Sequence, residues 1–296
     1  GGFSRNDYSQ WYELGIFIGR TNFYDVFGWY NQFIGVDCFC ISSGSMKTSI
    51  HHIVSSPKFV SSMKYYGWGL TCIGGAGVLL TAIMGYTYAP LVQSPPFRSP
   101  EAYRILFWHV PFAWTSFLSF CLLFIGAISW FLKRKEWGWN LFCTGSDLGL
   151  LFGLGVVISG PIWGSAEWGV PWDWGDLRLN TFGLLTAVAL FIVLSRKAQP
   201  DGIETRDTLS TVGLFGFALV PITAVATTVY QKRHPSVVIA ESSETGLDPK
   251  MLEVLILGVI SFWILMAGLS LLTYISYKME YELRKLLDKI DEEVVH

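Results

Sequence analysis

The chain alternates long apolar stretches with short polar ones, and this alternation is its most regular feature. A helix that crosses the hydrocarbon core of a bilayer needs roughly 20 apolar residues, and six stretches reach or approach that length. Because lipid offers the backbone no hydrogen-bond partners, each stretch is expected to form an α-helix. The pattern therefore predicts an all-α integral membrane protein with six transmembrane helices. They are expected at 65–88, 105–132, 137–162, 179–195, 208–230 and 254–277.

The composition agrees with this pattern and excludes other classes of protein. Of the 296 residues, 51% are hydrophobic and only 15% are charged, whereas a soluble domain carries about 25% charged residues. The net charge of −2 excludes the basic surface of a nucleic-acid-binding protein. The five cysteines contain no Cys-x-x-Cys pair, so neither a disulfide framework nor a cysteine-based zinc site is expected.

Lysine and arginine are unevenly divided between the two sets of connections, and this division predicts an orientation. The richer set comprises the connections after the second and fourth spans, the tail and the residues before the first span. The positive-inside rule places this set and both termini in the cytoplasm, with the protein in the cell (inner or cytoplasmic) membrane. The cations of this set are Lys47, Lys58, Lys64, Lys133, Arg134, Lys135, Arg196, Lys197, Arg206, Lys278, Arg284, Lys285 and Lys289.

Two regions flank the six-helix domain, which is assigned to residues 64–277. Residues 1–63 are an N-terminal extension, in which the aromatic stretch 11–40 is interrupted by charges and has no periodic pattern. Residues 1–45 are interpreted as an upstream extension or an arm with no catalytic role, and Met46 as a natural start. Residues 278–296 repeat apolar side chains at helical spacing, so they are expected to continue the sixth span as a cytoplasmic amphipathic helix.

The external connection between the third and fourth spans, residues 160–181, is the most distinctive segment. Its glycines and prolines, Gly164 among them, are expected to break any regular helix. Clustered tryptophans form a platform on which a large flat apolar ligand can stack, and the alternative is a belt that anchors helix ends among the headgroups. Their number and the interleaved charged residues favour the ligand. This segment holds four of the 13 tryptophans, namely Trp163, Trp168, Trp172 and Trp174.

Two of the five histidines fall on the same predicted outer face as the tryptophans. His109 lies about one turn, or ~6 Å, inside the outer end of the second span, and His234 lies in the connection after the fifth span. Singly, the first fits a histidine bonded to a neighbouring helix and the second an ordinary loop residue. Together they fit the two axial imidazoles of an iron porphyrin better than zinc, which needs a third or fourth nitrogen or sulfur ligand.

Charged side chains on the outer face offer partners for the two propionates of such a porphyrin. Arginine pairs with carboxylates in a bidentate manner, and Arg178, Arg104 and Arg233 are the candidates, with lipid phosphates as the alternative partner. Arg178 has the best claim because it belongs to the tryptophan-rich segment. Asp147 interrupts the third span and is expected to bond a neighbouring helix, with Ser146 or Thr144 as local partners.

Three motifs resemble those of one family of heme-handling proteins in cytochrome c biogenesis. The tryptophan-rich segment resembles its signature, Tyr103 to Pro111 resembles the first-histidine motif of the branch called CcmC, and 234–251 resembles its second-histidine loop. The family usually runs Trp-x-Trp-Asp, whereas Gly175 stands before Asp176 here, so either Asp173 or Asp176 is the family aspartate. Asp176 is favoured because Arg178 and Leu179 follow it at the spacing of the family motif.

The resemblance implies a function, a cofactor and partners. The protein is expected to bind heme b in transit on the outer membrane face, through the two histidines, the four tryptophans and Asp176. It is expected to deliver that heme to a membrane-anchored, CcmE-like heme chaperone during cytochrome c maturation. Further expected partners are the subunits of an ABC-type transporter, a small single-span membrane subunit and membrane lipid. The chain has no nucleophile–base pair and no phosphate loop, so no enzymatic activity is expected.

Three alternatives share some of these features. A cytochrome c synthetase-type heme lyase component has the tryptophan loop but more spans and further histidines inside the membrane. A b-type redox cytochrome needs histidine pairs on facing helices. A small-solute transporter is typically built from inverted repeats and broken helices, and the sequence indicates neither.

Overall fold

The structure is a computed structural model, and it describes residues 57–92, 98–229 and 247–295. Within these residues the chain is helical, and six helices are long and apolar enough to cross a membrane, which confirms the predicted fold class. The spans are formed by α4 (Pro57–Thr87), α5 (Leu106–Lys133), α6 (Glu136–Glu167), α7 (Leu177–Ala198), α8 (Ile203–Phe217) with α9 (Leu219–Val229), and α10 (Pro249–Val295). A 3₁₀ turn, η2 (Ala102–Ile105), precedes α5.

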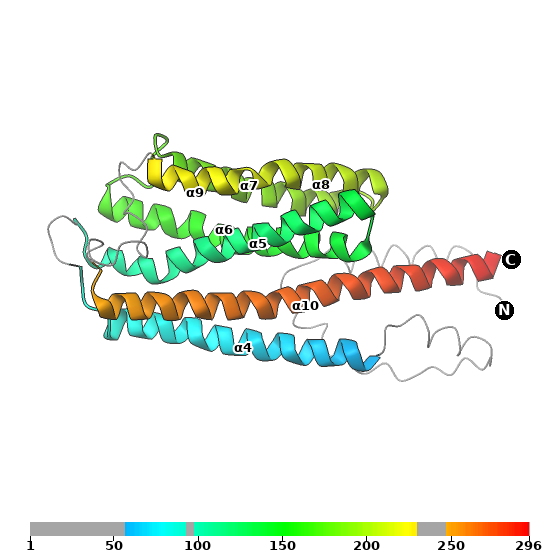
Figure 1. The fold of residues 1–296 in the computed structure, drawn as a ribbon, viewed down its shortest axis with the longest axis horizontal. Coiled ribbons are helices and arrows are strands. Elements are labelled where there is room, and N and C mark those ends of the chain that lie inside the picture. The colour runs from blue at the N-terminus through cyan, green and yellow to red at the C-terminus, as the bar shows by residue number, and fades with distance from the viewer. Residues whose placement is uncertain (1–56, 93–97, 230–246, 296) are drawn as a thin grey trace, which may run out of the picture. The chain divides into compact units, whose positions relative to one another are not determined.

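Successive spans run in opposite directions, so the described bundle has two ends (Figure 1). We call the end where α4 and α6 finish and α5, α7 and α10 begin the tryptophan end. The other end, where α5 and α7 finish and α6 and α8 begin, is the arginine end. The expected extension 1–45 and the second-histidine loop around His234 lie outside the described residues.

The core of the bundle is built on the contact between α5 and α6, the most extensive helix pair. The two helices approach closely because Gly126 and Gly145 have no side chains. A Cβ at Gly126 would overlap the backbone of Phe142, and one at Gly145 would overlap the backbone of Leu123. Small residues permit such an approach in lipid, where packing rather than hydrophobicity drives helix association. Fully buried side chains from α5, α6, α7 and α8 fill the remaining space, including Phe120, Leu123, Phe142, Leu185 and Leu209.

Helix α4 packs almost entirely against α10. Their closest approach is at Gly74, where a Cβ would overlap the backbone of Leu265. At the tryptophan end, the Tyr88 hydroxyl donates to Glu253 Oε2 across 2.8 Å. Elsewhere α4 exposes large apolar side chains such as Ile73 and Leu79, as expected of a helix whose outer face meets lipid.

Two helices differ from the sequence-based expectation. Helix α6 does not end near residue 162 but continues to Glu167, with Pro161 and Gly164 inside it, so the expectation that Gly164 breaks the helix is wrong. Proline removes one backbone donor, and membrane helices tolerate this where neighbouring groups compensate. The backbone ladder continues beyond it, because Trp168 N donates to Gly164 O across 2.8 Å.

The fifth span is interrupted, whereas the apolar pattern predicted one continuous helix over 208–230. Pro221 has no N–H for the carbonyl of Phe217, and just before it Ala218 N bonds Phe215 O, three residues earlier, at 3.1 Å, which is a 3₁₀-type contact. The chain therefore tightens at Ala218, and the span is divided into α8 and α9. Proline is a usual cause of such a kink.

Asp147 is held by two neighbouring helices. Its carboxylate pairs with Arg196 of α7 and accepts from the Tyr277 hydroxyl of α10, while Arg196 also donates to that hydroxyl across 2.8 Å. The expectation of a bond to a neighbouring helix is therefore confirmed. The local partners were wrong, because Ser146 and Thr144 donate to backbone carbonyls of α6 instead.

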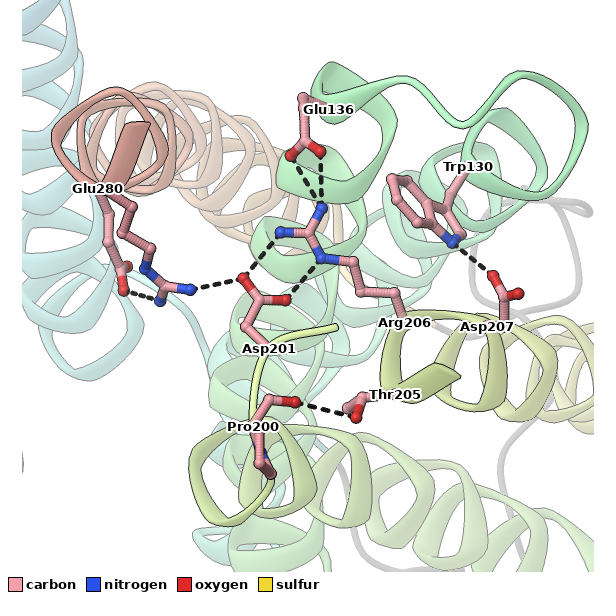
Figure 2. A network of polar contacts seen from close by, with 9 residues as sticks. Trp130, Glu136, Pro200, Asp201, Thr205, Arg206, Asp207 and Glu280 are labelled. Carbon is pink, nitrogen blue, oxygen red and sulfur yellow. Dashed lines mark hydrogen bonds and ion pairs between the residues drawn. The ribbon is translucent and has the colours of Figure 1, made fainter. Parts of the chain in front are cut away.

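A second polar network ties the arginine end together (Figure 2). Arg206 of α8 donates to both oxygens of Glu136 at 2.7 and 3.0 Å, and to both oxygens of Asp201 at 2.6 and 2.8 Å. Helix α10 runs without a break to Val295, and its Arg284 donates to Asp201 across 2.6 Å. The helical tail is thereby fastened to the connection between α7 and α8.

Candidate functional site

His109 lies in the first turns of α5 at the tryptophan end, half-buried against α6. Its Nδ1 is 2.8 Å from Ser159 Oγ. A Cβ at the neighbouring Gly160 would lie 3.3 Å from His109 Cε1, so the absence of a side chain there makes room for the ring. The first-histidine residue therefore faces α6 within the bundle.

An aromatic cluster lies one helical turn from Ser159 towards the tryptophan end. Trp163 of α6 is 9% exposed, and its ring meets the ring of Trp168 in a T-shape with centroids 4.9 Å apart. Tyr103 of η2 meets Trp163 in the same way at 6.2 Å. These rings pack with apolar residues of α5 and α10, so Trp163 belongs to a helix and to the core rather than to an exposed loop.

The other two tryptophans are placed by α7. Trp172 Nε1 donates to Asn180 Oδ1 across 3.1 Å, and the Asn180 amide donates to the carbonyl of Trp174 at 2.8 Å. The Trp172 and Trp174 rings lie 5.9 Å apart. Trp174 is 83% exposed, so the four tryptophans do not share one environment. Sequence reasoning missed Asn180, because an asparagine near a helix start looks like an ordinary cap.

The two candidate aspartates have different local functions. Asp176 is the N-cap of α7 and accepts from Leu179 N at 3.0 Å, which satisfies one of the backbone donors at the helix start. Asp173 accepts from Gly175 N at 2.9 Å and closes a turn. Asp176 therefore sets where α7 begins, and with it the position of Arg178.

The candidate cations are placed differently. The Arg178 side chain is buried at Nε and Nη2, and neither atom has a hydrogen-bond partner among the described residues. Arg104 instead donates to the carbonyls of Gly85 and Ala89 at the end of α4, and to Glu101 at 2.9 Å. Arg104 therefore caps α4 in this structure. Arg233 lies outside the described residues.

Glu167, at the end of α6, fixes the connection between α4 and α5. Its two carboxylate oxygens accept from the backbone N–H groups of Arg98 and Ser99 at 3.0 and 2.9 Å. Two charge-assisted bonds of this kind hold the chain firmly at the C-terminus of α6. Glu167 could not be recognised from the sequence, because its partners are backbone N–H groups, which any non-proline residue provides.

A bundle of six apolar helices with a histidine and clustered aromatic rings at one end defines a multi-span membrane protein with a candidate ligand site near one membrane face. The family model described as CcmC, heme exporter protein C, matches residues 50–288. The chain therefore belongs to the heme exporter protein C family, which confirms the resemblance found in its motifs.

Individual relatives match a smaller part of the chain than the family model does, and at low sequence identity. The chain is 24% identical over 202 residues to heme exporter protein C of Bradyrhizobium diazoefficiens, covering 68% of this chain and 76% of that protein. It is 31% identical over 131 residues to a putative ccmC-like mitochondrial protein of cytochrome c biosynthesis from Marchantia polymorpha. That match covers 44% of this chain and 55% of the Marchantia protein, so it spans about half the length of that relative.

Proposed function

We propose that this protein binds heme at the tryptophan end and delivers it to a membrane-anchored heme chaperone during cytochrome c maturation. The protein carries heme without chemical turnover, and the tryptophan end faces the outer side of the membrane. The observation that carries the proposal is His109, a histidine within a membrane span beside clustered aromatic rings. An ionisable residue inside a membrane span is a candidate functional residue, and imidazole is a usual axial ligand of heme iron.

His109 supplies one axial ligand in this proposal and His234 the second. Trp163 and Trp168 are the nearer aromatic rings, since Trp163 follows Ser159 by one turn of α6. Trp172 and Trp174 form the outer part of the surface, where the chaperone docks. The flat porphyrin gains from stacking on such rings beyond the apolar area that it buries.

Arg178 is the propionate partner best supported by the described residues. Its Nε and Nη2 are buried and have no hydrogen-bond partner among the residues that the structure describes, and such a charged group costs free energy until a negative group pairs with it. A propionate is such a group and fits the fork of arginine. Arg104 has a smaller part, because its guanidinium already caps α4.

Absorption spectra of the purified, heme-loaded protein test the proposal. His109→Ala and His234→Ala are each expected to lower the retained heme and to change its spectrum, and added imidazole should partly restore both. Unchanged spectra in both variants would contradict ligation by the two histidines. Heme that stays bound through repeated reduction and oxidation would favour a redox cytochrome instead.

The proposed orientation has a separate test. Gly175 and Gly202 lie in connections at opposite ends of the bundle, and each is replaced by cysteine in a background from which the five native cysteines have been removed. A membrane-impermeant maleimide should label Gly175→Cys in intact cells and Gly202→Cys only after lysis. The reverse pattern would place the site on the wrong side for cytochrome c maturation.

A further inference from the structure

We propose that Ser159 is the positioning residue of the heme ligand His109, because its hydroxyl fixes the imidazole in the tautomer that carries a lone pair on Nε2. This inference rests on the proposed function, in which the lone pair on Nε2 coordinates the heme iron. It concerns a residue that none of the sequence motifs singled out.

The geometry at Ser159 involves three atoms. Its Oγ is 2.6 Å from Gly155 O, one turn back in α6, and 2.8 Å from His109 Nδ1. A third contact, to Val156 O, is longer at 3.4 Å. Both short distances lie in the range of good hydrogen bonds.

Counting protons decides which atom donates in each contact. The hydroxyl has one proton, and the carbonyl of Gly155 can only accept. Ser159 therefore donates its proton to Gly155 O across 2.6 Å, since these two oxygens would repel each other at that distance without a proton between them. The remaining contact must be donated by His109, so Nδ1 carries the proton.

The consequence for His109 follows from the chemistry of neutral imidazole. One ring nitrogen carries the proton and the other carries the lone pair. With Nδ1–H donated to Ser159, the lone pair is on Nε2, which is the form that binds a metal. Partners of this kind fix both the tautomer and the ring orientation of metal-binding histidines.

The surrounding backbone holds this arrangement in place. Ser159 and Gly160 lie on α6, His109 lies on α5, and these two helices form the most extensive pair in the bundle. The Cβ position of Gly160 is 3.3 Å from His109 Cε1 and 4.0 Å from Leu179 Cδ1. The ring is therefore confined by its neighbours as well as by its hydrogen bond.

A purely structural explanation of Ser159 is available and can be separated from this one. Serine in an apolar helix commonly donates to the carbonyl four residues earlier, and Ser165 of the same helix does so to Pro161 O at 2.8 Å. If that bond were the purpose of Ser159, replacing either serine should have similar effects. Ser165 is thus the matched control.

The tautomer is measured in the heme-free protein, by ¹⁵N NMR of histidine-labelled protein in lipid. His109→Ala identifies the signals of His109. The parent should show protonated Nδ1 and unprotonated Nε2. Ser159→Thr and Ser165→Ala should keep this pattern, whereas Ser159→Ala and Ser159→Val should shift it towards the Nε2–H form. Thr and Val have nearly the same shape, so a difference between them reports the hydroxyl alone.

Heme retention is the second readout. Removing an outer-shell partner typically weakens metal binding 10–100-fold, so Ser159→Val should bind heme roughly tenfold more weakly than Ser159→Thr. An Nε2–H tautomer in the parent, or the same tautomer in Ser159→Val and Ser159→Thr, would overturn the role of Ser159 whatever heme does. Unchanged spectra in His109→Ala would instead contradict His109 as an axial ligand, and with it the purpose of Ser159. The two failures are distinguishable because the tautomer is read without heme.

Discussion

The Arg284 guanidinium on the tail of α10 donates to Asp201 Oδ2 across 2.6 Å, although 83 residues separate the two in the chain. Asp201 lies between this group and Arg206 (Figure 2). Because Arg206 also pairs with Glu136, loss of the Asp201 carboxylate would leave Arg206 with a partner but would release the tail. The connection between α7 and α8 is therefore one point at which the tail is held.

The first prediction concerns the pH dependence of this attachment. Burial alone would raise the pKa of Asp201, but the guanidinium groups of Arg206 and Arg284 outweigh it and hold the pKa below its ordinary value. A carboxyl group of this kind stabilises the folded form above its unfolded pKa of about 3.9. That contribution is lost as the pH falls through the lower folded value. We expect the tail to stay attached near neutral pH and to loosen only below about pH 4.

Hydrogen exchange of the tail amides measures this attachment. At neutral pH, Asp201→Asn should increase exchange in residues 278–290 several-fold. Asp291→Asn, an exposed carboxylate on the same tail, is the control and should change little. Equal exchange in Asp201→Asn and the parent would show that the ion pair does not hold the tail.

The second prediction concerns the buried pair of Asp147 and Arg196. Asp147→Asn leaves the Arg196 guanidinium, whose side chain is 9% exposed, without its counter-charge. Breaking a buried ion pair from one side typically costs about 3–5 kcal/mol, because an uncompensated charge remains. The double variant Asp147→Asn with Arg196→Gln should recover most of that loss. Thermal unfolding in detergent gives the comparison, and additive losses in the double variant would rule out coupling between the two residues.

The third prediction concerns Arg178. Arg178→Ala should weaken heme retention roughly tenfold, since a hydrogen bond to a charged group contributes about 1.5–3 kcal/mol. Heme dimethyl ester, which has no charged propionates, should bind the parent and Arg178→Ala equally. Lys197→Ala, at the arginine end, is the control and should bind heme as the parent does. A loss of ester binding in Arg178→Ala would indicate that Arg178 supports the fold rather than a propionate.

The fourth prediction concerns the tryptophans. If they only anchored helix ends in the interface, Trp168→Leu with Trp172→Leu would keep heme delivery, because leucine preserves apolar area. If the flat rings matter, the double leucine variant should insert normally but load little heme onto the chaperone, and phenylalanine at both positions should rescue more. Heme-loaded chaperone is the quantity to measure. Equal loading by the leucine variant and the parent would leave the interfacial belt as the explanation.

The number of spans was predictable because the length of an apolar stretch is itself the physical requirement for crossing a bilayer. Helix ends were less predictable. Helix α6 continues past Pro161 because packing of Trp163 supports a turn that local propensity disfavours. Partners of buried polar groups could not be predicted at all. Asp147 and Arg196 are 49 residues apart, and only the packing of α6 on α7 brings them together.

The candidate site shows the same division. His109 was identifiable because an imidazole inside an apolar stretch is rare and costly. Ser159 was not, because serines that bond their own helix are common in such stretches. The grouping of the tryptophans was predicted as one platform, yet Trp163 lies on a helix and Trp174 is largely exposed. Sequence spacing cannot distinguish these environments, since they depend on where α6 ends.

The close approach of α5 and α6 at Gly126 and Gly145 fixes the two helices against each other. The number of residues between this contact and the His109–Ser159 contact is therefore constrained on both helices. Each residue of an α-helix turns the chain by about 100° and advances it ~1.5 Å. One residue inserted between His109 and Gly126 would therefore turn the imidazole away from Ser159 while the glycine contact stayed in place. Variation in chain length is thus expected in the connections and the tail, and not between His109 and Gly126 or between Gly145 and Ser159.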